Sequence, residues 1–372
     1  MRVALFTTHF AINYGAVLQA YALQRSIRIL GHSCDIVDYR PTNRVDGRSA
    51  AYKFDSPKAS VYSTLQFLNL TYRANKKRKI EKFDAFLKEH CHLSRRTSDQ
   101  LLEFSRYLGL HEVLVCGSDQ VWNPRLFNES AYHLRFQFPT TDQILVAYAP
   151  SVAERIPEYE WNQLASKVQH IDHLSLRESL AARKLEQQLG RKVHHVVDPV
   201  FLLSCEDWSD IFCSIPIRTP YVLSYELVSN GCYQDLLKAV KKKTRSKLVN
   251  INLKPVRQRG ADCNIGDASP GQFVSLFRDA RFVCTSSFHG TVFAVLFGKQ
   301  FVTAPAASRS SRIVDLLDAL GLQDRLVDSH SDISRILDGP RIDFEQVEER
   351  LQSLRKSSLR YLSDSIITGS DR

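Results

Sequence analysis

Short apolar runs alternate with segments of helical periodicity along most of this chain. The first apolar run is Val3 to Thr7, and from Ala16 to Leu30 apolar residues recur at steps of four and three until Gly31 ends the pattern. Cys34 to Tyr39 is a second apolar run. A strand, a helix and a strand in this order predict the start of a doubly wound, parallel α/β domain.

The same alternation continues in two series and predicts the remaining elements. Further strands are expected at Val113–Cys116, Ile144–Tyr148, His173–Leu176, Val193–Val197, Tyr221–Tyr225, Lys247–Leu253, Arg281–Thr285 and Gln300–Thr303. Helices are expected at Lys76–Glu89, Glu158–Gln169, Ala181–Leu189, Tyr233–Lys242, Phe273–Ala280, Thr291–Phe297, Arg312–Leu320 and Phe344–Leu362.

The chain of 372 residues is too long for one comfortable core, so we expect two domains of the α/β class. Residues 1–204 form an N-terminal Rossmann-like domain, which a polar, basic insertion at about 41–100 interrupts. Residues 205–343 form a second Rossmann-like domain. Residues 344–372 form a terminal helix and tail, long enough to pack back on the N-terminal domain.

Composition indicates an ordinary cytoplasmic protein. The content of 44% hydrophobic and 24% charged residues is that of a globular domain, and no apolar run approaches the roughly 20 residues that span a bilayer. Met1 to Phe10 lacks the apolar core of a signal peptide and is better interpreted as the first strand. The eight scattered cysteines form no C-x-x-C pair, which favours reduced, buried thiols and no structural zinc site.

The net charge of +10 is partly local, because basic residues cluster at 73–82 and again at 238–247. The plain interpretation is two solvated helix faces. The sharper one is attraction to an anionic, lipid-linked substrate or to the inner face of a membrane. Nucleic acid is not expected as a partner, since no helix-turn-helix or aromatic-interleaved pattern accompanies the charge.

The most informative stretch is Arg281 to Val302, where an apolar strand ends at polar residues and a short apolar helix follows. His289 lies at the mouth of that helix. A histidine there either satisfies a core hydrogen bond or carries a proton to an anion held at the helix start. The polar run before it and the helix start after it favour function.

Three other polar segments follow predicted strands. Arg177 presents a planar guanidinium suited to a carboxylate or phosphate, or it pairs with Glu178 on the surface. Gly117-Ser118-Asp119-Gln120 is either a common turn or a site with one carboxylate. Asn13-Tyr14-Gly15 lacks a dinucleotide fingerprint and is either a close backbone approach or a simple helix start. Lys299 can reach a phosphate or cap the preceding helix.

Four segments together resemble the polysaccharide pyruvyl transferase family, in the family's order and over residues 1 to about 320. They are Asn13-Tyr14-Gly15-Ala16 to Gln24, Cys116 to Asn123, Ser175-Leu176-Arg177-Glu178 with Asp198-Pro199, and Ser287-Phe288-His289-Gly290 with its helix and Gly298-Lys299. The resemblance implies two Rossmann-like, doubly wound domains that face each other across a cleft, which is the GT-B architecture.

The resemblance also implies an activity, the transfer of a pyruvyl group from phosphoenolpyruvate to a sugar as a ketal. His289 would be the general acid, Arg177 would bind an anionic group of the donor, and Asp119 would orient or deprotonate the acceptor hydroxyl. Arg177 and His289 would then come from opposite domains and face one site. The residues expected to bind substrate are Asn13, Tyr14, Gly15, Gly117, Ser118, Gln120, Ser287, Gly290, Thr291 and Lys299.

This scheme implies no cofactor beyond phosphoenolpyruvate as the donor substrate, and no metal. The acceptor would be a sugar of an exopolysaccharide or cell-wall glycan, and whether it is lipid-linked is open. Two alternatives stay open at this point. A nucleotide-sugar-dependent glycosyltransferase would use the same arginine and helix start on a diphosphate. A non-catalytic polysaccharide-assembly protein would have no need for His289 and Arg177 at two strand ends.

Overall fold

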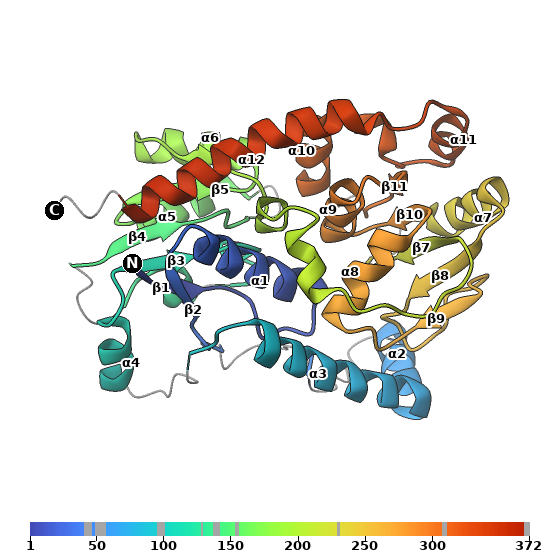
Figure 1. The fold of residues 1–372 in the computed structure, drawn as a ribbon, viewed down its shortest axis with the longest axis horizontal. Helices are drawn as coiled ribbons and strands as arrows, with labels where there is room; N and C mark the ends of the chain where they lie inside the picture. Colours follow the sequence, from blue (N-terminus) through green and yellow to red (C-terminus); the bar gives the residue numbers. More distant parts are fainter. Residues whose placement is uncertain are drawn as a thin grey trace. The chain divides into compact units, whose positions relative to one another are not determined.

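The computed structural model describes residues 1–40, 47–48, 57–94, 101–127, 129–136, 142–152, 156–228, 231–306 and 311–367 (Figure 1). The chain divides into two compact units. The first unit consists of Met1–Arg44, Leu87–Ser204 and Glu348–Arg372, and the second of Val45–Phe86 and Cys205–Val347.

The first unit is built on a parallel sheet with the strand order β2-β1-β3-β4-β5-β6. Its strands are β1 (Arg2–Phe6), β2 (Ser33–Ile36), β3 (Val113–Cys116), β4 (Ile144–Ala147), β5 (His173–Leu176) and β6 (His194–His195). Its helices are α1 (Tyr14–Ile29), α4 (Leu101–Leu108), α5 (Glu158–Val168) and α6 (Ser179–Leu189), with short 3-10 turns at Ser130–His133 and Pro199–Leu202.

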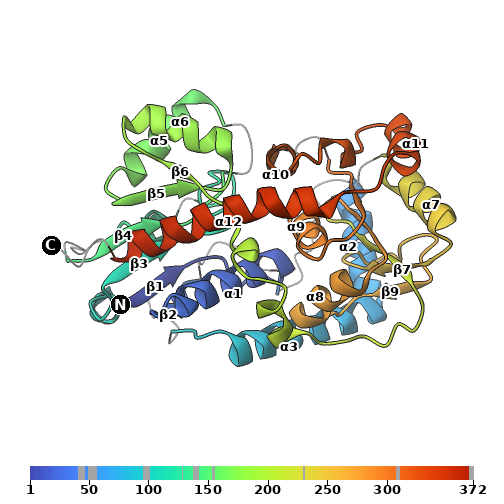
Figure 2. The same ribbon diagram turned by 45° about the horizontal axis from the view of Figure 1, so that its top comes forward.

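Helices cover both faces of this sheet: α1 lies on one face, and α5 and α6 lie together on the other (Figure 2). The central strands are therefore buried on both sides, which is why they are apolar throughout rather than alternating. The strand order reverses between β1 and β3, so the first topological switch point lies there.

The second unit is built on a parallel sheet with the order β11-β10-β7-β8-β9. Its strands are β7 (Tyr221–Tyr225), β8 (Lys247–Ile251), β9 (Cys263–Ile265), β10 (Phe282–Thr285) and β11 (Phe301–Thr303). Its helices are α2 (Pro57–Leu68), α7 (Tyr233–Thr244), α8 (Pro270–Asp279), α9 (Phe288–Leu296), α10 (Ser311–Leu320) and α11 (His330–Asp338), with 3-10 turns at Asp207–Ile211 and Gln323–Arg325. The strand order reverses between β7 and β10, which gives this unit its own switch point.

The basic insertion belongs largely to the second unit, whereas we expected it in the N-terminal domain. Its main helix is α3 (Leu70–His90), and the division between units falls within it, after Phe86. The reason is a set of contacts with the second sheet. Asp267 follows β9 and lies 2.8 Å from Arg78 Nε and 3.2 Å from Lys82 Nζ. Asn69 Nδ2, between α2 and α3, donates to the carbonyl of Pro255 over 2.7 Å.

The chain returns to the first unit within its last helix, α12 (Phe344–Ile367). Ser358 Oγ accepts a hydrogen bond from the backbone N–H of Val197, and the Tyr361 hydroxyl donates to the carbonyl of Ala147. Arg355 Nε donates to the carbonyl of Phe201. Within the described segments, no helix combines the length and the apolar character needed to cross a bilayer.

Candidate active site

The Gly-Ser-Asp segment forms a tight turn after β3, at the first switch point. Gly117 has φ of +113°, and a Cβ placed on it would lie 2.2 Å from the carbonyl oxygen of Tyr148. Only glycine therefore fits here. The turn leaves Asp119 partly exposed, and its Oδ2 accepts a hydrogen bond of 3.0 Å from Thr8 Oγ1, beyond β1. The one carboxylate of this motif is thus held at the carboxyl edge of the sheet.

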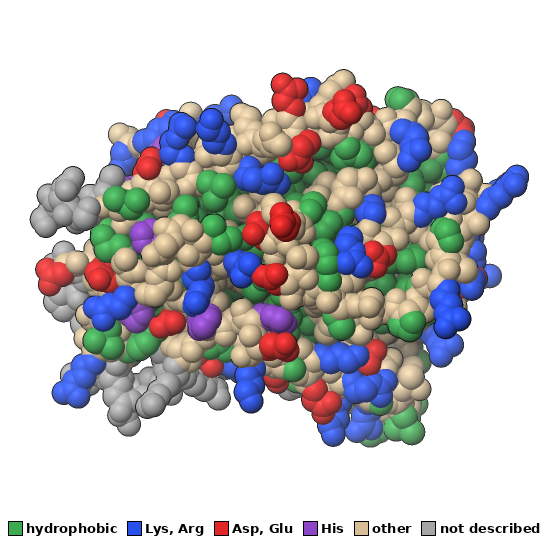
Figure 3. Space-filling view, in the orientation of Figure 1, with side chains coloured by type: hydrophobic (Ala, Val, Ile, Leu, Met, Phe, Trp, Pro, Cys, Tyr) green, Lys and Arg blue, Asp and Glu red, His purple; other side chains and the backbone are tan. Residues whose placement is uncertain are grey.

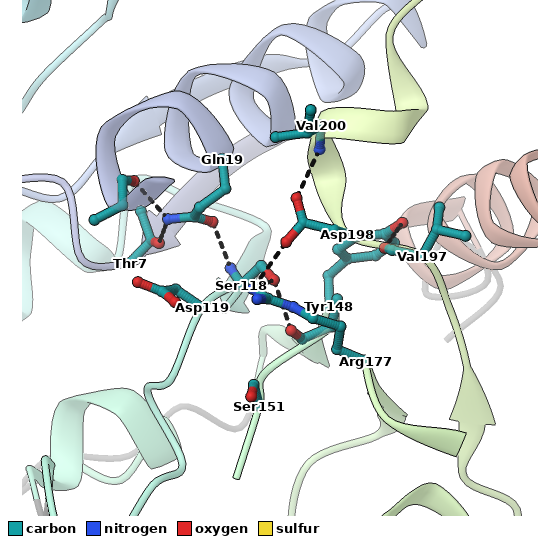
Figure 4. A network of polar contacts seen from close by, with 12 residues as sticks. Thr7, Gln19, Ser118, Asp119, Tyr148, Ser151, Arg177, Val197, Asp198 and Val200 are labelled. Carbon is teal, nitrogen blue, oxygen red and sulfur yellow. Dashed lines mark hydrogen bonds and ion pairs between the residues drawn. The ribbon is translucent and has the colours of Figure 1, made fainter. Parts of the chain in front are cut away.

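Arg177 lies at this edge as expected, but its guanidinium is buried rather than presented to solvent (Figure 4). Its Nη2 lies 3.1 Å from Asp198 Oδ2, and the two side chains are 3% and 1% exposed. The same nitrogen donates to Ser118 Oγ over 2.5 Å. The alternative of a surface pair with Glu178 is wrong, because both residues are buried; Glu178 also accepts a hydrogen bond from Ser151 Oγ. The guanidinium therefore links the ends of β3 and β6.

Gln19 of α1 joins the same network from the other side (Figure 4). Its Nε2 donates to Thr7 Oγ1 over 2.8 Å, and its Oε1 accepts from the backbone N–H of Ser118 over 3.2 Å. Asp198 is the N-cap of the 3-10 turn Pro199–Leu202, and its Oδ1 accepts from the backbone N–H of Val200, the second residue of that turn. Ser118 is thus held by three hydrogen bonds: its backbone N–H donates to Gln19, and its hydroxyl accepts from Arg177 and donates to the carbonyl of Ala149.

The Asn13 motif has the contacts of a helix start. Asn13 is the N-cap of α1 and accepts from the backbone N–H of Gly15, whereas Tyr14 and Gly15 are buried in the helix. Gln120 holds the end of the Gly-Ser-Asp turn, because its Oε1 accepts from Asn123 Nδ2. Contacts of these residues with a substrate stay predictions.

A second polar cluster, which the sequence pattern did not predict, lies at the ends of β1 and β2. His9 Nε2 lies 3.0 Å from Asp38 Oδ1, and Arg40 Nε donates to the same oxygen over 2.7 Å. Burial by itself raises the pKa of Asp38, but hydrogen bonds from His9 and Arg40 outweigh burial and lower it to about 2. His9 follows the first predicted strand, but Asp38 fell inside the predicted run Cys34 to Tyr39, because β2 ends earlier than expected, at Ile36.

In the second unit, the Ser287 to Gly290 segment lies after β10 at the switch point. The helix begins earlier than Thr291, the predicted start, because Ser287 is the N-cap of α9 and its Oγ accepts from the backbone N–H of Gly290 over 3.3 Å. A Cβ on Gly290 would lie 2.2 Å from Thr285 Oγ1, so a larger residue would displace the turn. Thr291 Oγ1 donates to the carbonyl of Ser287.

His289 is therefore the second residue of α9, and it is 8% exposed. Its ring packs edge-on against Phe288, with the centroids 5.3 Å apart. The guanidinium of Arg312, in the first turn of α10, lies over the Phe288 ring, 5.3 Å from its centroid. The sequence had not singled out Arg312, which is brought to this turn by the fold alone. The helix start thus combines a histidine with a nearby cation.

Two further charged residues follow strands of the second sheet. Lys254 Nζ, after β8, lies 2.6 Å from Glu226 Oε2, directly after β7. Ser286 Oγ ties this edge together by accepting from the backbone N–H of Leu227. Glu226 and Lys254 were not among the predicted site residues, although each is a polar residue that directly follows an apolar run.

Lys299 lies at the opposite edge of this sheet and is a correction to the expected site. It follows the C-terminus of α9 and precedes the amino end of β11, whereas His289 begins α9 after the carboxyl end of β10. Its backbone N–H donates to the carbonyl of Ala294, and Gly298 before it has φ of +60°. These are the contacts of a helix C-cap.

Solved structures identify the fold. The chain is similar to UGT89C1 of Arabidopsis thaliana complexed with quercetin, at 14% identity over 98% of this chain and 99% of that chain, with a TM-score of 0.52. The same protein complexed with UDP matches at 13% identity over 98% and 100%, with a TM-score of 0.50. An O-GlcNAc transferase of Thermobaculum terrenum matches at 11% identity and a TM-score of 0.47, and this chain spans 66% of its length. The fold is two Rossmann-like domains of the GT-B type.

A family model gives the closer relationship. No curated protein sequence matched the chain. The model described as Polysaccharide pyruvyl transferase matches residues 13–304, which is more than half of the chain and includes all four motifs. Both switch-point turns, with Asp119 and His289, lie within that match. The chain therefore belongs to the polysaccharide pyruvyl transferase family.

Proposed function

We propose that this protein transfers the pyruvyl group of phosphoenolpyruvate to a sugar of an exopolysaccharide or cell-wall glycan and forms a pyruvate ketal. The observation that carries the proposal is the position of His289. It is a buried histidine in the first turn of α9, at a switch point, inside the family match. Ligands of parallel sheets collect at such points, and a helix N-terminus favours an anion there.

At the donor, the reaction begins with a proton. In the proposal His289 gives it to the methylene carbon of phosphoenolpyruvate, and positive charge develops on the neighbouring carbon, C2. The start of α9 and the guanidinium of Arg312, beside Phe288, favour the donor's negative groups. In the proposal Arg312 binds the anionic group of the donor that we first assigned to Arg177, because Arg177 forms a buried ion pair with Asp198.

At the acceptor, the oxygen of one sugar hydroxyl bonds to C2. The oxygen of a second hydroxyl then bonds to C2 as the bond between C2 and the phosphate oxygen breaks, which releases phosphate. Two hydroxyl protons are released. One returns to the imidazole of His289 and restores the imidazolium that protonated the donor, and the other leaves with phosphate, so the reaction is balanced. Asp119 is the proposed first acceptor of a hydroxyl proton, since it is the partly exposed carboxylate of the Gly-Ser-Asp turn. Every bond change is polar, so the scheme calls for no redox cofactor.

Arg177 becomes a positioning residue in this proposal. It holds Ser118, the residue directly before Asp119, and thereby the direction of the Asp119 carboxylate. Its replacement should lower kcat and leave the KM for phosphoenolpyruvate nearly unchanged. A direct clamp would instead raise that KM.

The test is phosphate release from phosphoenolpyruvate with soluble aryl glycosides and with lipid-linked acceptors, in wild type and His289→Gln. We expect turnover to fall roughly 10²- to 10⁴-fold in the variant, with the thermal shift induced by phosphoenolpyruvate retained. His194→Gln is the matched control, because His194 lies on the edge strand β6 of the first unit. Normal turnover by folded His289→Gln would contradict the proposal.

The nucleotide-sugar alternative is tested in the same measurements. A glycosyltransferase would show a large thermal shift with a UDP- or GDP-sugar and none with phosphoenolpyruvate. The likeness to UGT89C1 concerns the fold alone and does not favour that activity.

A further inference from the structure

The corner between α2 and α3 exposes an unusual number of large apolar side chains. The part of the chain that the structure describes has 13 exposed large hydrophobic residues, and five of them fall within residues 61–70. A cluster of this density is not the scattered exposure that any soluble protein shows. The five are Val61, Leu65, Phe67, Leu68 and Leu70.

A neighbouring loop extends this surface. Asn69, at the corner, donates to the carbonyl of Pro255 over 2.7 Å, and the next residue, Val256, is 56% exposed. Asn69 also caps α3, because its Oδ1 accepts from the backbone N–H of Tyr72 over 2.8 Å. The corner is therefore built and held against its own unit, and we call these six apolar residues with Asn69 the α2–α3 corner.

Positive charge predominates around the α2–α3 corner, and three of its basic residues lie beside acids: Lys77 beside Glu81, Arg78 beside Asp267 and Lys254 beside Glu226. Residues 57–80 and 251–261 contain nine Lys and Arg residues and no Asp or Glu. The Arg73 guanidinium lies 5.7 Å from the centroid of the Phe67 ring, and Lys77 is exposed one turn further along α3. In Figure 3, hydrophobic side chains lie among Lys and Arg side chains at the lower right, over α2 and the adjoining end of α3.

The opposite face of α3 is different in kind. Lys79, Phe83 and Phe86 are buried, so that face packs against the protein and not against a partner. Arg78 and Lys82 are paired with Asp267. The helix thus divides into an inner face that holds the second unit together and an outer, cationic end beside the α2–α3 corner.

We infer that the α2–α3 corner docks on an anionic lipid bilayer, with its apolar side chains in the interface and its basic residues on the headgroups. Exposed leucine and phenylalanine beside lysine and arginine is the chemistry that such an interface recognises. A second copy of this chain is disfavoured as the occupant, because two equal positive surfaces would face each other. The inference deepens the proposed function, since a bilayer would present a lipid-linked glycan acceptor.

The experiment is cosedimentation of the full chain with vesicles, without donor or acceptor, so its result does not depend on the proposed reaction. Vesicles of phosphatidylcholine with added phosphatidylglycerol are compared with phosphatidylcholine alone, at low and high salt. Wild type should pellet with the anionic vesicles, and less at high salt. Phe67→Ser/Leu68→Ser/Leu70→Ser and, separately, Arg73→Glu/Lys77→Glu should each reduce the partition coefficient roughly tenfold or more.

Matched controls separate this surface from general stickiness and charge. Leu110→Ser/Leu126→Ser/Leu180→Ser removes three exposed leucines elsewhere, and Lys238→Glu/Lys242→Glu reverses two charges in the other basic cluster. Both control proteins should pellet like wild type. All five proteins are also compared by light scattering.

Two outcomes would overturn the inference. One is equal pelleting of wild type and both corner variants. The other is a wild-type oligomer that the serine variant dissociates with no change in vesicle binding, which would make the α2–α3 corner an interface between copies. Phosphate release on soluble aryl glycosides should be unchanged in all variants, so a loss there would concern the proposed reaction and not the docking.

Discussion

The buried pair of Arg177 and Asp198 allows a test of how the candidate site is held together. Asp198→Asn removes the negative charge that lies 3.1 Å from the guanidinium and keeps an oxygen to accept from the backbone N–H of Val200. Because the two side chains are 3% and 1% exposed, water cannot replace the lost charge. Breaking such a pair from one side typically costs about 3–5 kcal/mol.

A loss of about 3–5 kcal/mol corresponds to a fall of roughly 10²- to 10⁴-fold in the equilibrium constant for folding of the first unit. Arg177→Met should cost a similar amount, since it leaves the Asp198 carboxylate buried without that cation. The double variant, Arg177→Met/Asp198→Asn, should be less destabilised than the sum of the two, by about 1–3 kcal/mol. That coupling is the signature of a direct buried pair.

The assay exploits the positions of the three tryptophans. Trp122 and Trp161 lie in the first unit and Trp208 in the second, so a Trp208→Phe background makes fluorescence report the first unit alone. Urea unfolding of the four proteins in this background gives each free-energy difference. Costs below about 1 kcal/mol that simply add in the double variant would refute the reasoning, because that is how an exposed pair behaves.

Three further predictions concern single positions. Gly117→Ala should lower the free energy of unfolding by more than the roughly 1–3 kcal/mol of backbone strain, because the new Cβ would also clash with the Tyr148 carbonyl. Gly190→Ala is the control in the same urea assay, because Gly190 has φ of +64° but nothing within 4 Å of its Cβ position. Hydrogen bonds lower the pKa of Asp38 from 3.8 to about 2, so the ionised Asp38 stabilises the fold above about pH 4 and this stabilisation is lost toward pH 2. The difference in melting temperature between wild type and Asp38→Asn should therefore shrink from about pH 4 to about pH 2. A constant difference would contradict this role of the carboxylate. Lys299→Met should leave the kinetic constants for phosphoenolpyruvate within about twofold, because Lys299 lies at the amino edge of the sheet; a large rise in KM would place it back at the donor.

The positions of the candidate residues in each unit could largely be predicted, because the strands are apolar runs with polar residues directly after them. Asp119 and His289 both follow such runs, so the sequence alone brings each to the carboxyl edge of its sheet. The pairing of Arg177 with Asp198 had no local signal, since the partners follow different strands and only the register of β5 and β6 joins them.

Other features were missed for reasons of size or context. The edge strand β9 has three residues, Cys263 to Ile265, which is too short for a period to appear. The insertion was assigned to the wrong unit because sequence order favours neighbours along the chain, whereas Asp267 attracts Arg78 and Lys82 from 185 or more residues away. Arg312 is brought beside Phe288 by the packing of α10 on α9.

The motif residues divide into those that build the turns and those that remain for chemistry. In the first unit, Gly117 gives the turn its backbone conformation, and Ser118 and Arg177 are hydrogen-bonded to each other. In the second, Ser287 and Gly290 form the helix cap in the same way. A turn built from mutually bonded residues is rigid, and rigidity is what orients a single titratable group without reorganisation during the reaction. These signature residues are therefore scaffold, and the proposed reaction assigns the proton transfers to the carboxylate of Asp119 and the imidazole of His289.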